Sequence, residues 1–198
     1  MIRDAIILTL IAGIAGGFAG SIAGCSVFDT RDPEDPEIGV GTWLQPDTPD
    51  RVMRNIQNSI AEMNSRNYLR SLGPEFIFRA TVSAIAREPS LWSSWAIPEE
   101  ETYFGRLVAS SNFLSGHSLQ LLDIIENVIN EDRFVIDANY ILTVQHSRSA
   151  EDIPTEFHGH LVWAIQRSSE GLWYLQDWTD QEVQNQPSWS ELKSTFVK

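Results

Sequence analysis

The residue with the most distinctive chemistry is Cys25, the only cysteine in a chain of 198 residues. A disulfide within the chain is therefore impossible, and a single cysteine indicates either a bond to another chain or a reactive thiol. Cys25 directly follows an uncharged, largely apolar stretch that runs from Ala5 to Gly24. Its position offers a third interpretation, in which the cysteine itself is modified.

The four residues Ile22-Ala23-Gly24-Cys25 resemble the lipobox of bacterial lipoproteins, an aliphatic residue and two small residues followed by cysteine. The resemblance implies cleavage between Gly24 and Cys25. It also implies that the thiol carries a diacylglyceryl group through a thioether and that a fatty acid such as palmitate acylates the new N-terminus. Residues 1–24 then form a signal peptide, since a short basic start and an apolar run precede the cleavage point. The diacylglyceryl group and the fatty acid on the N-terminus are together enough for stable anchoring to a membrane.

An uncleaved transmembrane helix is the alternative for the same segment. The apolar run is about as long as a bilayer is thick, and its glycines four residues apart suit close helix packing in lipid. We favour the lipoprotein because five glycines disfavour a long helix. Arg3 is the only positive charge before the run, so either anchor places the acidic part outside the cytoplasm, facing the periplasm. Ser26 after the cysteine slightly favours the outer membrane, by the sorting pattern of enterobacterial lipoproteins.

Two histidines, His158 and His160, are the candidates for a metal site. They lie two residues apart in a predicted strand, so their side chains point to the same face. With a third ligand they could begin a zinc site. The apolar residues of this strand, however, are Phe157, Leu161 and Trp163. We therefore place the histidines on a solvated polar face, with a partner-binding edge as the alternative, and predict no metal and no cofactor.

The chain divides into the signal peptide, an acidic proline-rich tether over residues 25–48, and a domain over residues 49–198. Trp43 and Leu44 are expected to dock on the domain. Apolar spacing predicts helices near residues 49–63, 66–72, 98–108 and 188–196. Period-two patterns predict strands near residues 75–80, 119–129, 133–145, 156–166 and 172–178. Helices gathered before a run of strands favour an α+β fold.

The order of these elements and the pattern Val135, Ala138-Asn139-Tyr140-Ile141-Leu142, Gly159, Trp163 and Gly171-Leu172-Trp173-Tyr174-Leu175 resemble the NTF2-like superfamily. This resemblance implies a cone, in which a curved antiparallel sheet wraps on about three N-terminal helices and a short helix ends the chain. Isomerases of the superfamily use a carboxylate base with a tyrosine and a second acid. These roles do not map onto matching positions here, so no catalytic residue is predicted.

Several other residues are explained by their structural role and need no catalytic one. The glutamates 99–101 follow Pro98 at a predicted helix start, where the helix dipole favours negative charge. Trp163 and Trp173 are predicted to lie in the core. Trp178 and Trp189 lie near the end of the sheet, where they could line a pocket mouth or an interface. The net charge of −13 makes nucleic acid an unfavourable partner.

The favoured function is a lipid-anchored, non-enzymatic binding or scaffolding domain with an unidentified protein or small-molecule partner. The alternative is an isomerase or dehydratase type of enzyme that acts on a small apolar molecule. A homodimer through the open face of the sheet is possible. The interior of the cone discriminates between the two functions, because an enzyme needs a buried titratable group that converges on a cavity.

Overall fold

A computed structural model describes residues 41–111, 116–184 and 186–198 of the chain. The lipobox at residues 22–25, the signal peptide and most of the predicted tether lie outside the described residues. Within the described part, no helix is both long and apolar enough to cross a bilayer.

The helices are α1 (Pro49–Ala61), α2 (Ser65–Leu69), α3 (Val82–Arg87), α4 (Pro89–Trp92), α5 (Ile97–Ser110) and α6 (Trp189–Phe196), with a 3₁₀ turn at Ser147–Glu151. The strands are β1 (Leu72–Arg79), β2 (Ser118–Asn130), β3 (Arg133–Thr143), β4 (Glu156–Arg167) and β5 (Trp173–Glu182). The α+β class is confirmed, as is the short helix at the C-terminus.

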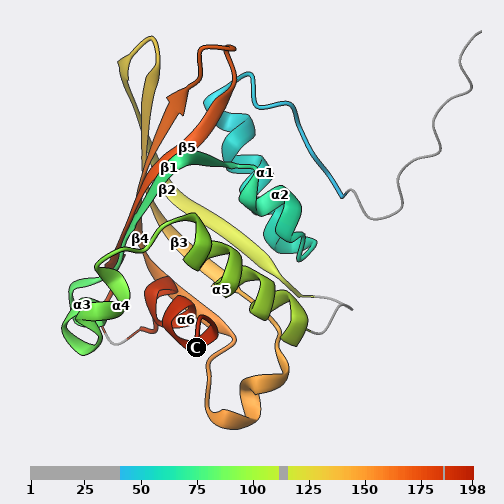
Figure 1. Cartoon of the computed structure of the whole chain (residues 1–198), viewed down its shortest axis with the longest axis vertical. Coiled ribbons are helices and arrows are strands. Elements are labelled where there is room, and N and C mark those ends of the chain that lie inside the picture. The colour runs from blue at the N-terminus through green and yellow to red at the C-terminus, as the bar shows by residue number, and fades with distance from the viewer. Residues whose placement is uncertain (1–40, 112–115, 185) are drawn as a thin grey trace, which may run out of the picture. The chain divides into compact units, whose positions relative to one another are not determined.

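The five strands form one sheet in the order β1-β5-β4-β3-β2 (Figure 1). The pairs β2–β3, β3–β4 and β4–β5 are antiparallel, as expected for strands joined by hairpins or short loops. The pair β1–β5 is parallel, so the prediction of a wholly antiparallel sheet is wrong at this edge. A parallel partner needs a long crossover, and here all of α3 to β4 intervenes.

Two local boundaries also differ from the sequence prediction. The strand predicted from residue 75 begins at Leu72, the last residue of the helix predicted near residues 66–72, and runs through Gly73. A Cβ at Gly73 would lie 2.3 Å from the ring of Tyr174, so glycine lets β1 pass close to β5. The stretch before α5, which has no clear pattern, contains the short helices α3 and α4.

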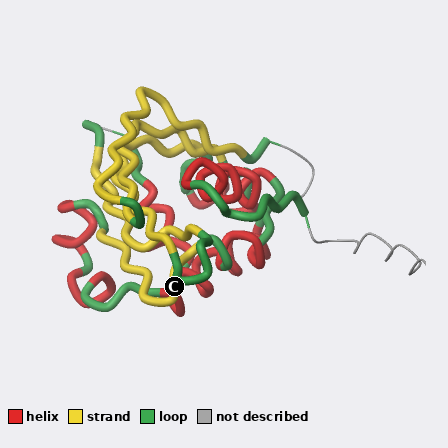
Figure 2. Tube along the Cα trace, turned by 90° about the horizontal axis from the view of Figure 1, so that it is seen from above, coloured by secondary structure: helices red, strands yellow, loops and turns green. Residues whose placement is uncertain are grey.

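Helices α1, α2, α5 and α6 lie on one side of the curved sheet (Figures 1 and 2). Alternating residues of β3 and β4 point toward these helices and are buried, among them Ile136, Ala138, Leu161 and Trp163. The amphipathic helix α1 packs against β2 and β5, with Val52, Ile56 and Ile60 on its inner face. These inward side chains form one continuous apolar core.

The segment just before α1 is fixed to the domain, which confirms the predicted docking of Trp43 and Leu44. The backbone N–H of Leu44 donates to the side-chain oxygen of Asn55 at 2.8 Å, and the amide of Asn55 donates to the Leu44 carbonyl at 2.6 Å. The guanidinium of Arg70 lies 3.4 Å from the centre of the Trp43 ring, a cation–π contact.

Candidate site in the cone interior

The most unusual side chain of the domain is Lys193, a lysine on α6 with no exposed surface. It lies four residues after Trp189 and three before Phe196, so all three share the inner face of the helix. Its Nζ is hydrogen-bonded to the carboxylate of Glu100 on α5, and the pair is completely buried. A buried charge pair requires good geometry and further hydrogen bonds to offset its loss of hydration.

Aromatic rings surround the ammonium group of Lys193. Nζ lies 3.8 Å from the centre of the Phe78 ring and 4.1 Å from that of Trp178. The rings of Tyr103 and Trp95 stand at 5.4 and 5.6 Å. Burial lowers the pKa of Lys193 to about 8, against the opposing effects of the Glu100 and Asp180 carboxylates. The ring faces give the cation a partial substitute for water.

Glu100 accepts hydrogen bonds with both oxygens. Oε2 accepts from the Tyr68 hydroxyl at 2.8 Å, and Oε1 accepts from the Trp95 indole N–H at 2.8 Å as well as from Lys193. Glu100 and Glu99 both lie in the first turn of α5, as the helix-dipole interpretation predicts, but that interpretation does not account for the burial of Glu100 or for its bond to Lys193. Glu99 accepts from the Ala96 N–H at the helix start. Glu100 faces inward because it precedes Tyr103 and Phe104 by one helical turn.

A second buried acid, Asp180, lies on β5 beside the start of α6. Its Oδ2 accepts from the Ser190 N–H at 2.7 Å and from the Ser190 hydroxyl at 2.6 Å. Its Oδ1 accepts from the Tyr140 hydroxyl at 2.8 Å. Burial raises the pKa of Asp180 to about 6, although these hydrogen bonds and Lys193 act in the opposite direction. The carboxylate thus holds the first turn of α6 against the sheet.

Tyrosine hydroxyls complete this polar network. The Tyr140 hydroxyl accepts from the Trp189 N–H at 2.7 Å, and the Tyr103 hydroxyl accepts from the Trp189 indole N–H at 2.9 Å. Gly159 opposite Tyr140 leaves the space for this ring, since a Cβ there would lie 2.4 Å from the hydroxyl oxygen. Burial raises the pKa of Tyr68, Tyr103 and Tyr140 well above the usual value, so all three stay protonated at neutral pH.

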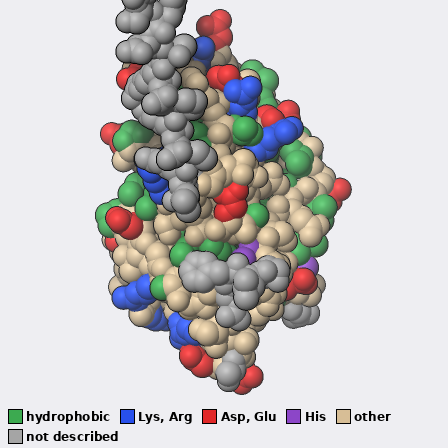
Figure 3. All heavy atoms as spheres, turned by 90° about the vertical axis from the view of Figure 1, so that its right-hand side faces the viewer, with side chains coloured by type: hydrophobic (Ala, Val, Ile, Leu, Met, Phe, Trp, Pro, Cys, Tyr) green, Lys and Arg blue, Asp and Glu red, His purple; other side chains and the backbone are tan. Residues whose placement is uncertain are grey.

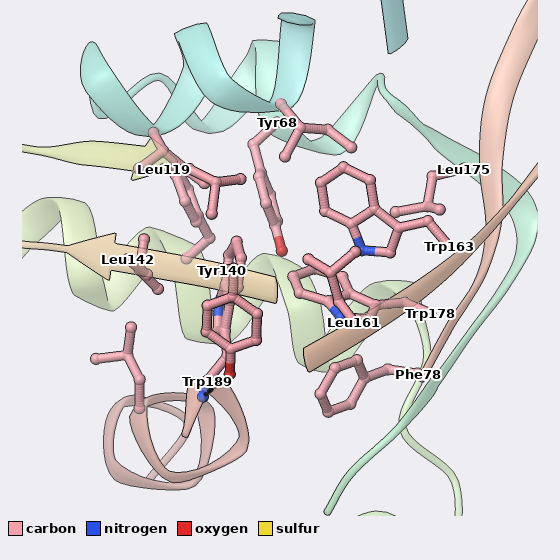
Figure 4. Close-up of a cluster of buried hydrophobic side chains, with 14 of the residues drawn as sticks. Tyr68, Phe78, Leu119, Tyr140, Leu142, Leu161, Trp163, Leu175, Trp178 and Trp189 are labelled. Carbon is pink, nitrogen blue, oxygen red and sulfur yellow. Dashed lines mark hydrogen bonds between the residues drawn. The ribbon is translucent and has the colours of Figure 1, made fainter. Parts of the chain in front are cut away.

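Trp178 and Trp189, expected at a pocket mouth or an interface, are both fully buried in the core. Their rings meet edge to face at 4.3 Å, and Trp178 meets Trp163 in the same way at 5.5 Å. Figure 4 shows these rings inside the cone, with Phe78 beside Trp178. The expectation is not met because β5 continues to Glu182, which places Trp178 in mid-strand, and because α6 turns Trp189 inward.

His158 and His160 lie on the opposite, polar face of β4, as predicted. The ring of His158 is hydrogen-bonded to the carboxylate of Glu156 at 2.9 Å. The ring of His160 is bonded to Asn139 at 3.1 Å and lies 3.1 Å from Asp137. Within the described segments, no group of three or more His, Cys, Asp or Glu side chains is arranged to hold a metal ion.

Four depressions lined by described residues have volumes of about 240, 360, 450 and 470 Å³. None of Glu100, Asp180 and Lys193 lines any of the four. The depression of about 450 Å³ between β1 and α4 has Phe78 and Trp95 in its wall. On the face seen in Figure 3, acidic, basic and hydrophobic side chains are interspersed.

Chemically, the interior holds an amine, two carboxylates and three phenols in two hydrogen-bonded groups. One joins Lys193 and Tyr68 to Glu100. The other joins Asp180 to Tyr140, and Tyr140 through Trp189 to Tyr103. Each carboxylate oxygen already accepts a hydrogen bond from a neighbouring side chain or backbone N–H. Such a network can fix α5 and α6 to the sheet, because removal of any member leaves a buried polar group unpaired.

Comparison with solved structures shows a shared fold at very low sequence identity. A proposed aromatic ring hydroxylase from Novosphingobium aromaticivorans superposes with a TM-score of 0.55 at 12% identity, over 73% of this chain and 92% of that one. A proposed scytalone dehydratase from the same organism gives 0.53 at 7%, over 71% and 89%. An NTF2-like protein from Cytophaga hutchinsonii gives 0.50 at 10%, over 71% and 99%.

The domain has the NTF2-like fold. No family model matches the sequence, and no curated protein matches it either. The domain therefore shares its fold with structural neighbours whose sequences it resembles very little. Since identities this low show the fold alone, the activities of the neighbours do not transfer to this chain.

Proposed function

We propose that this protein is a lipid-anchored protein of the bacterial cell envelope whose NTF2-like domain is a non-enzymatic interaction module. The observation that carries the proposal is the filled interior. Trp163, Trp178 and Trp189 occupy the cone with no exposed surface. Beside them, Lys193 is hydrogen-bonded to Glu100, and Asp180 accepts from Ser190. In an enzyme of this fold, a reactive group would have to face a space for substrate.

Binding of small apolar molecules tests the filled interior. We expect no thermal shift when the protein is titrated with benzene or with cyclic ketones. A Leu161→Ala variant provides the control, because loss of this fully buried side chain costs about 2–5 kcal/mol and leaves a cavity that such molecules can enter. A saturable shift for the unmodified protein, measured by differential scanning calorimetry, would contradict the proposal.

Lipid attachment is tested separately at Cys25. The Cys25→Ala variant is expected to lose incorporation of radiolabelled palmitate in bacterial cells and to keep its signal segment, which adds residues 1–24 to the mass of the product. Ser26→Ala is the matched control and should be labelled and cleaved. Palmitate labelling that persists in Cys25→Ala would show that the anchor is not at this cysteine.

A second candidate is an isomerase or dehydratase type of enzyme. The pair formed by the Asp180 carboxylate and the Tyr140 hydroxyl favours it, because a buried acid with a raised pKa beside a phenol can move protons. This function requires α6 to move, because Asp180 already accepts a hydrogen bond from Ser190 and the Tyr140 hydroxyl already accepts one from Trp189. The ligand titration above discriminates between the two candidates.

A further inference from the structure

A depression of about 450 Å³ lies at the edge of the sheet, between β1 and α4. Strand β1 is the outermost strand on this side in the described part of the chain. Along β1, Phe78 points into the core, whereas its neighbours Ile77 and Arg79 point to the open face. All three line the depression, so it follows the edge of the sheet from the core side to the open side. Its volume lies within the range of about 300–1,000 Å³ that is usual for ligand sites.

Three aromatic rings form an apolar wall of this depression. The rings of Trp92 and Trp95 stack with their centres 4.6 Å apart, and the Phe78 ring lies 5.8 and 5.9 Å from them. The indole N–H of Trp92 donates to the Ala84 carbonyl at 3.1 Å. The indole N–H of Trp95 donates to Glu100 at 2.8 Å. Because both N–H groups are used inside the protein, the rings offer a ligand apolar surface.

Aliphatic side chains continue this apolar surface to the rim. Ile77 on β1 and Ile85 on α3 line the depression and are 44% and 41% exposed. Helices α3 and α4 lie together at one end of the sheet, where this rim is formed (Figure 1). Exposed apolar side chains that gather around a depression indicate a binding site.

Arg79 supplies the only charged group among the described residues that line the depression. The walls of the other three depressions each contain at least one carboxylate, as expected for a chain with a net charge of −13. A small organic anion would therefore meet an acid in each of those three and only a cation in this one. Opposite charges attract more strongly in such a partly desolvated site than in water.

The neighbours of Arg79 leave its positive charge incompletely neutralised. Nη1 of Arg79 donates to Asp177 at 2.9 Å, and Arg133 lies 3.7 Å from the other oxygen of the same carboxylate. Two guanidinium groups thus share one negative charge. Behind the aromatic wall, Lys193 and Glu100 form an ion pair, so together they add no net charge. The Arg79 side chain is 52% exposed and can bind a further carboxylate.

We propose that this depression binds a small organic anion, in which one carboxylate is attached to an aromatic or branched aliphatic body. The body would pack against Phe78, Trp92 and Trp95, and the carboxylate would accept hydrogen bonds from Arg79. A guanidinium suits this role because its planar set of N–H donors matches a carboxylate. Apolar walls with a few polar groups that orient the ligand are the usual construction of a ligand site.

Charge should decide which molecules bind. Hydrocinnamate, a phenyl ring joined to a carboxylate by two methylene groups, has the required chemistry, and its neutral amide has nearly the same shape. We expect hydrocinnamate to bind with a dissociation constant of about 1 mM or below, and the amide at least about tenfold more weakly, since it lacks the charge-assisted bond. Benzene and cyclic ketones carry no charge and are likewise expected to bind here too weakly to shift the melting temperature.

The test uses the full chain in phosphatidylcholine nanodiscs at pH 7, labelled with fluorinated tryptophan and observed by fluorine NMR. Trp92→Phe, Trp95→Phe and Trp163→Phe variants assign the resonances. Titration with hydrocinnamate should shift the Trp92 and Trp95 resonances saturably, because both rings line the depression. The Trp163 resonance should stay unchanged, because that ring is fully buried in the cone.

Two pairs of variants locate the binding. Arg79→Gln should weaken hydrocinnamate to the level of the amide and leave the amide unchanged, because it removes the charge. Arg87→Gln is the matched control, since the Arg87 side chain is 53% exposed, pairs with Glu191 and does not line the depression. On α3, Ile85→Glu should weaken hydrocinnamate at least about tenfold by repulsion. Val82→Glu, on the same helix but outside the depression, should leave the constant nearly unchanged.

Three results would each overturn the proposal: unshifted Trp92 and Trp95 resonances, equal affinity for hydrocinnamate and its amide, or unchanged affinity in Arg79→Gln. The inference deepens the proposed interaction module by naming a ligand class, and it rests on that proposal. The two fail separately. Equal affinity for acid and amide at Trp92 and Trp95 would remove the anion site and leave the filled cone and the palmitate labelling as they were. A saturable shift of the Trp163 resonance would instead place the ligand inside the cone and contradict the filled interior.

Discussion

Replacement of Glu100 by glutamine is expected to lower the free energy of unfolding by about 3–5 kcal/mol, because it removes the carboxylate that is paired with the buried ammonium of Lys193. Glutamine keeps the size of the side chain and can still accept from Tyr68 or Trp95, so the loss reports mainly the charge. Urea denaturation at pH 7, monitored by the fluorescence of the buried tryptophans, measures the change.

The double variant Glu100→Gln/Lys193→Met is the control for this prediction. It should regain much of the lost stability, because no uncompensated charge remains and methionine fills the space among the aromatic rings that surround Lys193. The pH dependence adds a further readout. The folded-state pKa of Lys193 is lowered to about 8 from 10.5, so the unfolded state binds more protons between these values. Stability of the unmodified protein should therefore rise with pH across that window. In the single variant the Glu100 carboxylate no longer raises the pKa of Lys193, so the rise should begin at a lower pH. A loss below about 1 kcal/mol would show that the ion pair is not a structural element.

When the pH is lowered from 7 to 4, the free energy of unfolding of the unmodified protein is expected to rise by about 3 kcal/mol relative to that of Asp180→Asn. The folded-state pKa of Asp180 is about 6 and the unfolded value is 3.8, so the folded state binds the extra proton between these values. The contribution of this group to stability therefore falls as pH rises from about 4 to about 6. Asparagine cannot titrate, so the variant lacks this component. Denaturation curves at several pH values measure the difference.

Asp177→Asn provides the matched control on the same strand. Asp177 lies on the open face, partly exposed, and pairs with Arg79 at 2.9 Å. Its replacement should lower the free energy of unfolding by about 0–1 kcal/mol, without the pH-dependent component that is specific to Asp180. If Asp180→Asn and Asp177→Asn show the same pH dependence, the raised pKa and the link from Asp180 to α6 are both wrong.

Much of the fold could be predicted because hydrophobic period reports local structure directly. The alternation in β3 and β4 and the helical spacing in α1 each follow from burial of one face. The capping box at Ser188 and Glu191 marks the start of α6, and both of its hydrogen bonds are present. The parallel pairing of β1 with β5 left no local signal, because strands far apart in sequence make it.

The sequence did not lead to a prediction that Lys193 and Glu100 are buried, for a related reason. Lys193 and Glu100 each stand one helical turn from inward aromatic residues, so position alone could have placed them on the inner face. The usual rule that such residues are exposed outweighed this spacing. Trp178 and Trp189 were misplaced in the opposite direction, since the length of β5 and the angle of α6 decide whether they face solvent.

By itself, the sequence determined the α+β class and most of the strands. It also supports the prediction of a lipid anchor at Cys25, since a lipobox is a local pattern. Only the tertiary structure decided what the interior of the cone contains. Burial of Lys193, Glu100 and Asp180 depends on side chains from β1, β3, α5 and α6 meeting in one place, and no segment of the chain encodes that meeting alone.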